Sequence, residues 1–270
     1  MFYHPLRFYL IYCLASLCLP DPLHKLYRDD ILVPILLQIY NGILQLEEYP
    51  KQWCIFTTVV LRKPGKPAYD VPKAYRPITL LNTMGKVITM IIAEEISNIV
   101  KKEGLLPVNH FGGRPSHTMM DTIHLLIHRI KEAWRRGKVT SILFLDVEGA
   151  FPNAITERVI HNLKRCGIPS RHVKYVTNLI DRRLMQLKFD DYLSQLMTID
   201  NGIGQGDPLS MILYIIYNAD LIEIAEGNKE ESLGYADDAI VIVEGKDFYK
   251  TTLKLEDIMN RLLQFSILEQ

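Results

Sequence analysis

Apolar residues along the chain repeat with two spacings, and each spacing predicts a different element. From Asp29 to about Glu48 they recur three and four positions apart, as on one face of an amphipathic helix that Asp29 and Asp30 can cap. Capping residues and apolar spacing predict further helices at 84–101, 116–137 (from Ser116 or Thr118), 155–166, 170–180 and 207–226, and one running to the end after residue 245. The helix at 207–226 is apolar on most sides, so we expect it to be buried.

Apolar and β-branched runs predict strands at 55–61, 139–146, 184–189 and 196–200. Residues 62–77, RKPGKPAYDVPKAYRP, are typical of a loop because they are rich in Pro and Gly. The stretch SLGYADDAIVIVEG at 232–245 predicts a hairpin with Asp237 and Asp238 at its tip, which alone is compatible with an ordinary turn. This mixture of strands and helices predicts an α+β architecture.

Composition allows one large core or two modest lobes within 270 residues. Lys+Arg and Asp+Glu balance at 31 each, so a nucleic-acid partner has to be argued from local charge. The segments 127–138 and 158–188 are basic and 220–257 is acidic. Solvated helix faces explain such runs, and so does a protein that grips phosphates and metal ions.

Cysteine usage and the N-terminal segment bear on the compartment. The four cysteines have no CxxC spacing, which favours a reducing environment. The apolar stretch 8–19 is too short to span a bilayer and is followed by no clear signal-peptide cleavage site. We therefore expect an intracellular protein of the nucleus or cytoplasm with no membrane partner, and treat residues 1–28 as a segment of uncertain role.

Candidate chemistry begins with a further carboxylate, Asp146, at the end of the strand 139–146. If that strand neighbours the hairpin in one sheet, Asp146, Asp237 and Asp238 converge, and their repulsion raises pKa values or demands cations. Hard oxygen ligands suit Mg²⁺, and two such ions stabilise both oxygens of an in-line phosphoryl displacement. The segment NGIGQGDPLS at 201–210 lets backbone approach a ligand, but it lacks the GK[ST] of a Walker loop.

Five segments in this order resemble the motifs of reverse transcriptases. FLDVEGAF, NGIGQGDPLS and GYADD are similar to the three palm motifs, AYRPITLLNTMGKV to a finger motif, and NHFGGRPSHTMMDTIHLLIHRI to the segment before the first palm motif. The resemblance covers roughly residues 32–265 and is strongest to non-LTR (LINE-type) retrotransposon polymerases of the fungal kind. It implies a right-hand polymerase with a fingers-like region at 29–138 and a palm-like catalytic region at 139–270, truncated before the thumb.

The resemblance also implies residue roles. Asp146 and Asp237 look like the metal ligands, Asp238 like the supporting carboxylate, and the Val147 carbonyl like a further ligand, for two Mg²⁺ ions or Mn²⁺. Phe151 looks like the sugar gate that excludes the ribose 2′-OH. Gln205 and Gly206 resemble the pair that lines the incoming nucleotide and template base. Arg76 and Lys63 look like the two cations that bind the triphosphate. The alternatives are a core position for Phe151 and plain surface charges for the two cations.

The predicted function is RNA-directed DNA polymerisation, with an RNA template, a DNA primer and dNTPs as partners. Gly204 and Met211 depart from the Pro that the broad family often has there, a variant familiar from the fungal subset. By comparison with that family, we expect the thumb, the primer grip and an endonuclease domain to be missing from these 270 residues. Two alternatives stay open: an RNA-dependent RNA polymerase, which Phe151 disfavours, and a truncated retroelement remnant without turnover.

Overall fold

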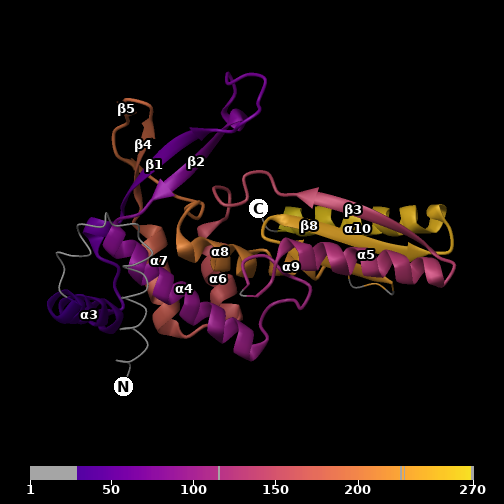
Figure 1. Cartoon of the computed structure of the whole chain (residues 1–270), viewed down its shortest axis with the longest axis horizontal. Helices are drawn as coiled ribbons and strands as arrows, with labels where there is room; N and C mark the ends of the chain where they lie inside the picture. The colour runs from indigo at the N-terminus through magenta and orange to yellow at the C-terminus, as the bar shows by residue number, and fades with distance from the viewer. Residues whose placement is uncertain (1–28, 115, 226, 228, 269–270) are drawn as a thin grey trace. The chain divides into compact units, whose positions relative to one another are not determined.

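The computed structural model describes residues 29–114, 116–225, 227 and 229–268 (Figure 1). The chain forms two compact units. The first comprises residues up to Ile99 together with Phe151–Ser210, and the second comprises Val100–Ala150 together with the residues from Met211 onward. Each unit is therefore built from two separate stretches of sequence. The apolar stretch at 8–19 lies outside the described residues.

The first unit contains a five-stranded sheet. Strand β1 (Ile55–Arg62) pairs antiparallel with β2 (Tyr75–Leu80) and parallel with β4 (Leu184–Phe189), which also pairs with β5 (Tyr192–Leu193) and β6 (Met197–Thr198). The unit's other elements are α3 (Asp29–Leu46), η1 (Lys51–Trp53), η2 (Pro72–Ala74), most of α4 (Thr83–Glu103), α6 (Thr156–Arg165) and α7 (Ser170–Asp181).

Strand β2 corrects the prediction of a loop over residues 62–77. Its first three residues, Tyr75 to Pro77, belong to that stretch, and β2 forms the edge of its sheet. A proline lacks a donor for the ladder and is tolerated in an edge strand, where one side of the backbone needs no partner. The signal that indicated a loop is therefore compatible with this strand.

Aromatic rings in edge-to-face contact fill part of the core of the first unit. Tyr49 and Tyr175 meet edge to face with ring centroids 5.6 Å apart, and both side chains are buried. Trp53 meets Tyr49 in the same manner at 6.0 Å. Edge-to-face pairs of this kind add about 1 kcal/mol each beyond the burial of their area, so they hold η1 against α7.

The second unit is a three-layer sandwich around an antiparallel sheet of β3 (Val139–Asp146), β8 (Asp238–Gly245) and β7 (Glu230–Tyr235), in that order (Figure 1). Helix α5 (Met119–Arg135) covers one face, where Leu126 packs with Leu233 and Ile242. Helix α10 (Phe248–Leu268) covers the other face, where Ile258 packs with Val241 and Val243. Successive residues of a strand point to opposite faces, so the run Ile240 to Val243 is apolar at every position because both faces are covered.

The predicted helix at 207–226 is two helices, α8 (Pro208–Tyr217) and α9 (Ala219–Ile222). Asn218 separates them with φ −96° and ψ 4°, outside the helical well. Asn is a poor interior helix residue because its side chain competes with the backbone for hydrogen bonds. The expected burial is confirmed, since residues 209, 210 and 212–216 are all buried.

Among the residues that the structure describes, every helix is too short or too polar to cross a bilayer.

Candidate active site

Two of the predicted carboxylates are cross-strand neighbours in the sheet of the second unit. Asp146 is the last residue of β3, Asp238 is the first residue of β8, and the antiparallel register pairs them directly. Tyr235, the last residue of β7, is the partner of Asp238 on its other side. Residues opposite each other in an antiparallel pair carry side chains on the same face, so the register brings together two acids that are distant in sequence.

Asp237 lies in the turn between β7 and β8, next to Ala236. Ala236 is buried and has φ +56°, in the left-handed region that residues other than Gly seldom occupy. Such strain persists only where surrounding contacts fix the backbone, and it clusters at functional sites. The predicted hairpin is confirmed, with Asp237 in its turn and Asp238 opening the second strand.

The three carboxylates influence one another electrostatically. Partial burial, followed by the charges of Asp237 and Asp146, raises the pKa of Asp238 above its ordinary value. Burial and then the charge of Asp237 raise the pKa of the Tyr214 hydroxyl, with a smaller contribution from Asp146. Tyr214 belongs to α8, so these carboxylates lie near that helix as well as near each other.

A divalent cation fits this set of oxygen donors. Within the described residues, no three His, Cys, Asp or Glu side chains already surround one point as a metal site. After burial, the charges of Asp237 and Asp146 contribute to the raised pKa of Asp238, and a bound cation would relieve this repulsion. Carboxylate oxygens are the ligands that Mg²⁺ and Mn²⁺ prefer.

The two predicted triphosphate-binding cations lie on the β1–β2 hairpin of the first unit (Figure 1). Arg76 of β2 is paired with Leu61 of β1. The Lys63 amide donates to the Ala74 carbonyl at 2.9 Å, which continues the same register beyond the strand. Arg76 and Lys63 are thus diagonal neighbours on one side of the hairpin, and the Arg76 side chain is exposed.

The glycine-rich segment that carries Gln205 and Gly206 packs against β2. The Thr79 amide donates to the Gln205 carbonyl at 2.7 Å. Gly206 has φ +109°, and a Cβ there would lie 3.0 Å from the Thr79 carbonyl oxygen. The close approach therefore requires Gly, and it places Gln205 beside the strand that holds Arg76.

Phe151 joins this group through the backbone. The Ile203 amide donates to the Phe151 carbonyl at 2.8 Å, and the Gly202 amide donates to the Ala154 carbonyl at 2.7 Å. The first unit thus links all five predicted nucleotide-binding residues through one set of backbone hydrogen bonds. These five residues come from three distant parts of the sequence: the β1–β2 hairpin, the segment 151–154 and the segment 202–206.

Sequence reasoning missed a buried cation beneath this segment, Arg183. Its Nη2 donates to the Gly202 carbonyl and its Nε to the Ile180 carbonyl at 3.1 Å, and only 7% of the residue is exposed. Asp207 is nearby: burial raises the pKa of Asp207 to about 6, although the charge of Arg183 opposes the shift. The sequence placed Asp207 only at the start of a helix, and its Oδ1 accepts from the Leu209 amide at 2.9 Å, as in an N-cap. Nothing local in the sequence connects Asp207 with Arg183.

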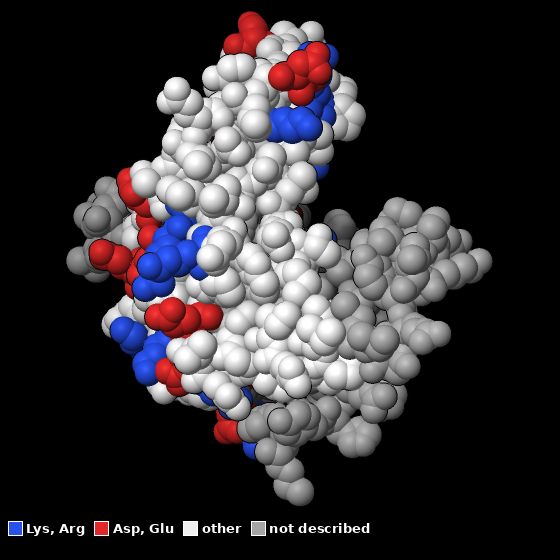
Figure 2. Space-filling view, turned by 90° about the vertical axis from the view of Figure 1, so that its left-hand side faces the viewer, with Lys and Arg blue, Asp and Glu red and all other residues white. Residues whose placement is uncertain are grey.

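The charged runs of the sequence neutralise one another in part. In the second unit, Arg129 pairs with Glu231 and Arg136 with Glu244. These pairs join the basic run at 127–138 to the acidic run at 220–257. Figure 2 shows one face of the molecule on which acidic and basic side chains are interspersed rather than gathered into fields of one sign. Two arginines of the basic run thus have carboxylate partners within the fold.

In the second unit, helices cover both faces of an antiparallel sheet, and two aspartates lie at adjoining strand ends. The chain belongs to the reverse transcriptase family: the family model described as reverse transcriptase (RNA-dependent DNA polymerase) matches residues 61–267. The predicted family and the predicted α+β class with polymerase fingers and palm are thereby confirmed.

Curated relatives include proteins from mobile elements of Drosophila melanogaster. A probable RNA-directed DNA polymerase from transposon BS is 27% identical over 83% of this chain and 25% of its own length. The RNA-directed DNA polymerase from mobile element jockey is 26% identical over 88% of this chain and 26% of its own. These relatives confirm the LINE-type resemblance, whereas the fungal subset stays a prediction. The chain spans about a quarter of the length of these relatives.

Solved structures of telomerase share the fold. Apo telomerase from Candida tropicalis superposes with a TM-score of 0.57 at 11% identity, over 82% of this chain and 50% of that one. Telomerase from Candida albicans, in complex with a fragment of telomeric RNA, gives a TM-score of 0.54 at 10% identity, over 83% of this chain and 43% of that one. At these identities the similarity concerns the fold.

Proposed function

We propose that this reverse transcriptase domain transfers nucleotides from dNTPs to the 3′-OH of a DNA primer on an RNA template. The observation that carries the proposal is the register pair of Asp146 and Asp238, with Asp237 in the adjoining turn. Members of this family use divalent metal ions, and the proposal assigns their binding to these three carboxylates and the Val147 carbonyl. Two Mg²⁺ ions, or Mn²⁺, would supply charge stabilisation at the attacking and leaving oxygens when bound.

The proposal gives the first unit the task of holding the nucleotide. Arg76 and Lys63 bind the triphosphate, because fixed cations stabilise charge that spreads over phosphate oxygens. Gln205 and Gly206 line the incoming nucleotide and the template base, with a backbone held in place by Thr79. Phe151 excludes a ribose 2′-OH, which favours dNTPs. The RNA bound in the similar telomerase structure supports RNA as the template partner.

The division into a fingers-like region at 29–138 and a palm-like region at 139–270 remains part of this proposal. So does the set of individual roles, which rests on the motifs that match the family.

Primer extension tests the proposed function. Purified protein is given an RNA template, a DNA primer, Mg²⁺ and dNTPs, and Asp237→Ala is compared with Asp191→Ala, which removes an exposed carboxylate elsewhere. We expect extension by the wild type and by Asp191→Ala, and loss of at least about 10³-fold in Asp237→Ala, as for removal of a group that stabilises transition-state charge. Extension that survives in Asp237→Ala contradicts the assignment.

The second candidate is a retroelement domain that folds without turning over nucleotides. A folded wild-type chain that extends no primer would favour it. Circular dichroism of the same samples separates this result from misfolding.

A further inference from the structure

The segment Asn109–Gly113, here called the brace, runs beside the turn that carries Asp237. The Phe111 amide donates to the Gly234 carbonyl at 2.7 Å, and the Gly234 amide donates to the Asn109 carbonyl at 2.9 Å. These bonds form a short parallel bridge between His110 and Gly234. The brace is thus attached to β7 one residue before Tyr235, where the turn begins.

Gly112 brings the brace into contact with the turn itself. A Cβ on Gly112 would collide with the Ala236 amide nitrogen and would lie 2.8 Å from the Tyr235 carbonyl carbon. Neither atom belongs to a flexible side chain, so any larger residue at position 112 displaces backbone. Only Gly fits this approach.

His110 fills the space between the brace and β7. The residue is completely buried, and its Cδ2 lies 2.7 Å from the point where a Cβ on Gly234 would stand. Within the described residues its ring nitrogens lie beside backbone groups of Ala236 and Gly112 without completing a full hydrogen bond. Burial lowers the pKa of His110 to about 4, so the ring is uncharged at neutral pH.

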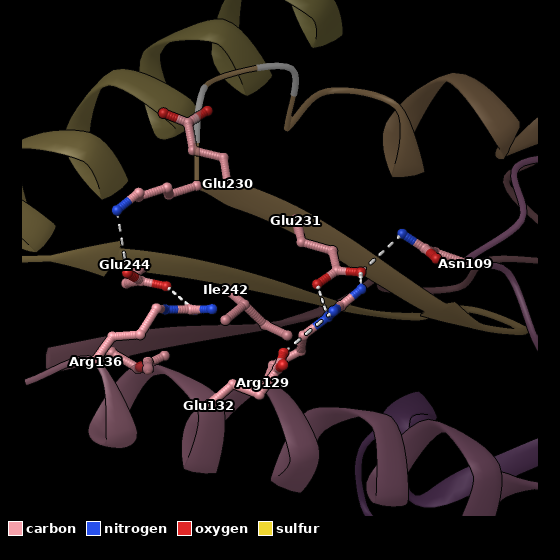
Figure 3. Close-up of a pocket in the computed structure, with 11 residues that line it drawn as sticks. Asn109, Arg129, Glu132, Arg136, Glu230, Glu231, Ile242 and Glu244 are labelled. Carbon is pink, nitrogen blue, oxygen red and sulfur yellow. Dashed lines mark hydrogen bonds and ion pairs between the residues drawn. The ribbon is translucent and has the colours of Figure 1, made fainter. Parts of the chain in front are cut away.

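The other end of the brace is anchored in a charged pocket of about 450 Å³ between α5 and the sheet (Figure 3). Asn109 Nδ2 donates to Glu231 Oε1 at 3.2 Å. Arg129 holds the same carboxylate with two bonds, from Nε at 2.7 Å and from Nη2 at 3.0 Å. Two bonds from one guanidinium fix the orientation of a carboxylate, so the position of Asn109 is coupled to helix α5.

We propose that the brace is a positioning element for the catalytic turn, and that His110 and Gly112 are positioning residues that hold Ala236 and Asp237 in place. Ala236 adopts a strained backbone conformation, which requires contacts from outside the turn. The brace provides such contacts in three ways. His110 packs against β7, Asn109 is tied to α5 by way of Glu231 and Arg129, and the backbone of Gly112 lies against the turn. The link between the brace and metal binding rests on the proposed function. The effect of the brace on the turn rests on the contacts alone.

Two adjacent glycines provide a matched pair of variants. Gly112→Ala adds a methyl group against the backbone of the turn. Gly113→Ala adds the same methyl group one residue later, at a φ of +66°, against the flexible ends of Met211 and Ile215, the latter 2.6 Å away. Both substitutions are expected to lower thermal stability, but only Gly112→Ala should move the turn.

The first readout is amide hydrogen exchange of residues 233–241 in metal-free protein, which reports local opening. We expect faster exchange in Gly112→Ala than in the wild type, and wild-type exchange of this peptide in Gly113→Ala. Equal exchange in the two variants overturns the proposal. If Gly112→Ala does not fold, His110→Gln takes its place, with faster exchange of the same peptide expected and wild-type exchange overturning the proposal.

The second readout is Mn²⁺ binding, followed by electron paramagnetic resonance without primer or nucleotide. We expect roughly tenfold weaker binding in Gly112→Ala than in Gly113→Ala, the loss typical when support of a metal ligand is removed. Asp237→Ala tests metal binding by Asp237 separately from fixation of the turn by the brace. If it binds Mn²⁺ as the wild type does, the proposed function fails, while the exchange data still decide whether the brace fixes the turn.

Discussion

Asp207 provides a quantitative test of the segment that carries Gln205. Its carboxyl group caps α8 and lies close to Arg183, and burial raises its pKa from 3.8 to about 6. Asp207→Asn keeps the size of the side chain and the cap, since Asn is also a good N-cap residue. The change removes the ability to ionise and replaces one carboxylate oxygen by an NH₂ group, so the test relies on how the stability difference changes with pH and not on its size at one pH.

The magnitude follows from linkage. A carboxyl group whose pKa is raised by folding binds its proton more tightly in the folded state, so the wild type loses stability as the pH rises from about 4 to about 6. Each pKa unit corresponds to about 1.4 kcal/mol, so a shift of about two units costs about 3 kcal/mol in total. Part of this falls below pH 4.5. The free energy of unfolding of Asp207→Asn, relative to wild type, should therefore rise by about 2 kcal/mol from about pH 4.5 to about pH 7.5.

Urea unfolding at several pH values, followed by circular dichroism, measures this difference. Taking the difference between variant and wild type cancels the contributions of groups that titrate in both proteins. The attraction between ionised Asp207 and Arg183, which the variant lacks, is already included in the pKa of Asp207. Asp191→Asn is the control, because Asp191 is exposed. A difference between Asp207→Asn and wild type that stays constant with pH would refute the reasoning, since it would show that Asp207 ionises as freely in the folded chain as in the unfolded one.

Two further predictions concern the sugar gate and the turn. Phe151→Val should raise incorporation of rNTPs relative to dNTPs by at least about tenfold, the effect of about 1.4 kcal/mol, in single-nucleotide primer extension; unchanged discrimination in an active variant would show that Phe151 is no gate. Ala236→Gly should raise the free energy of unfolding by about 1 kcal/mol, because Gly adopts the left-handed conformation without strain. Thermal denaturation measures it, and a stability equal to or below the wild type would mean that the φ of Ala236 carries no strain.

The sheet of the second unit was the most predictable part of the molecule. Apolar and β-branched runs at 139–146 and 239–243 predicted β3 and the β7–β8 hairpin. The position of Asp146 at a strand end indicated where the carboxylates would meet. The register that pairs Asp146 with Asp238 could not be derived, because it depends on which strands become neighbours. The motif resemblance supplied that information.

The remaining features depend on contacts that no local pattern encodes. Strand β2 was hidden by Pro77, whose meaning changes once the strand lies at an edge. The contact of Arg183 with Gly202 and its charge interaction with Asp207 depend on tertiary packing. The close approach of Gly112 to Ala236 likewise appears only when two segments separated by more than a hundred residues are folded together.

The interleaving of the two units has a consequence for how the chain acquires its structure. Strand β1 must wait for β4 before their parallel pairing can form, and β3 must wait for β8. Contacts of such long sequence separation slow folding and expose unpaired strands in the meantime. On the ribosome, β1 and β3 therefore both emerge well before their partners. The first unit has all of its residues once Ser210 has emerged, whereas the second unit must wait for the residues from Met211 onward. A single cleavage of the chain cannot separate the two units from each other, because each is built from two stretches separated by part of the other.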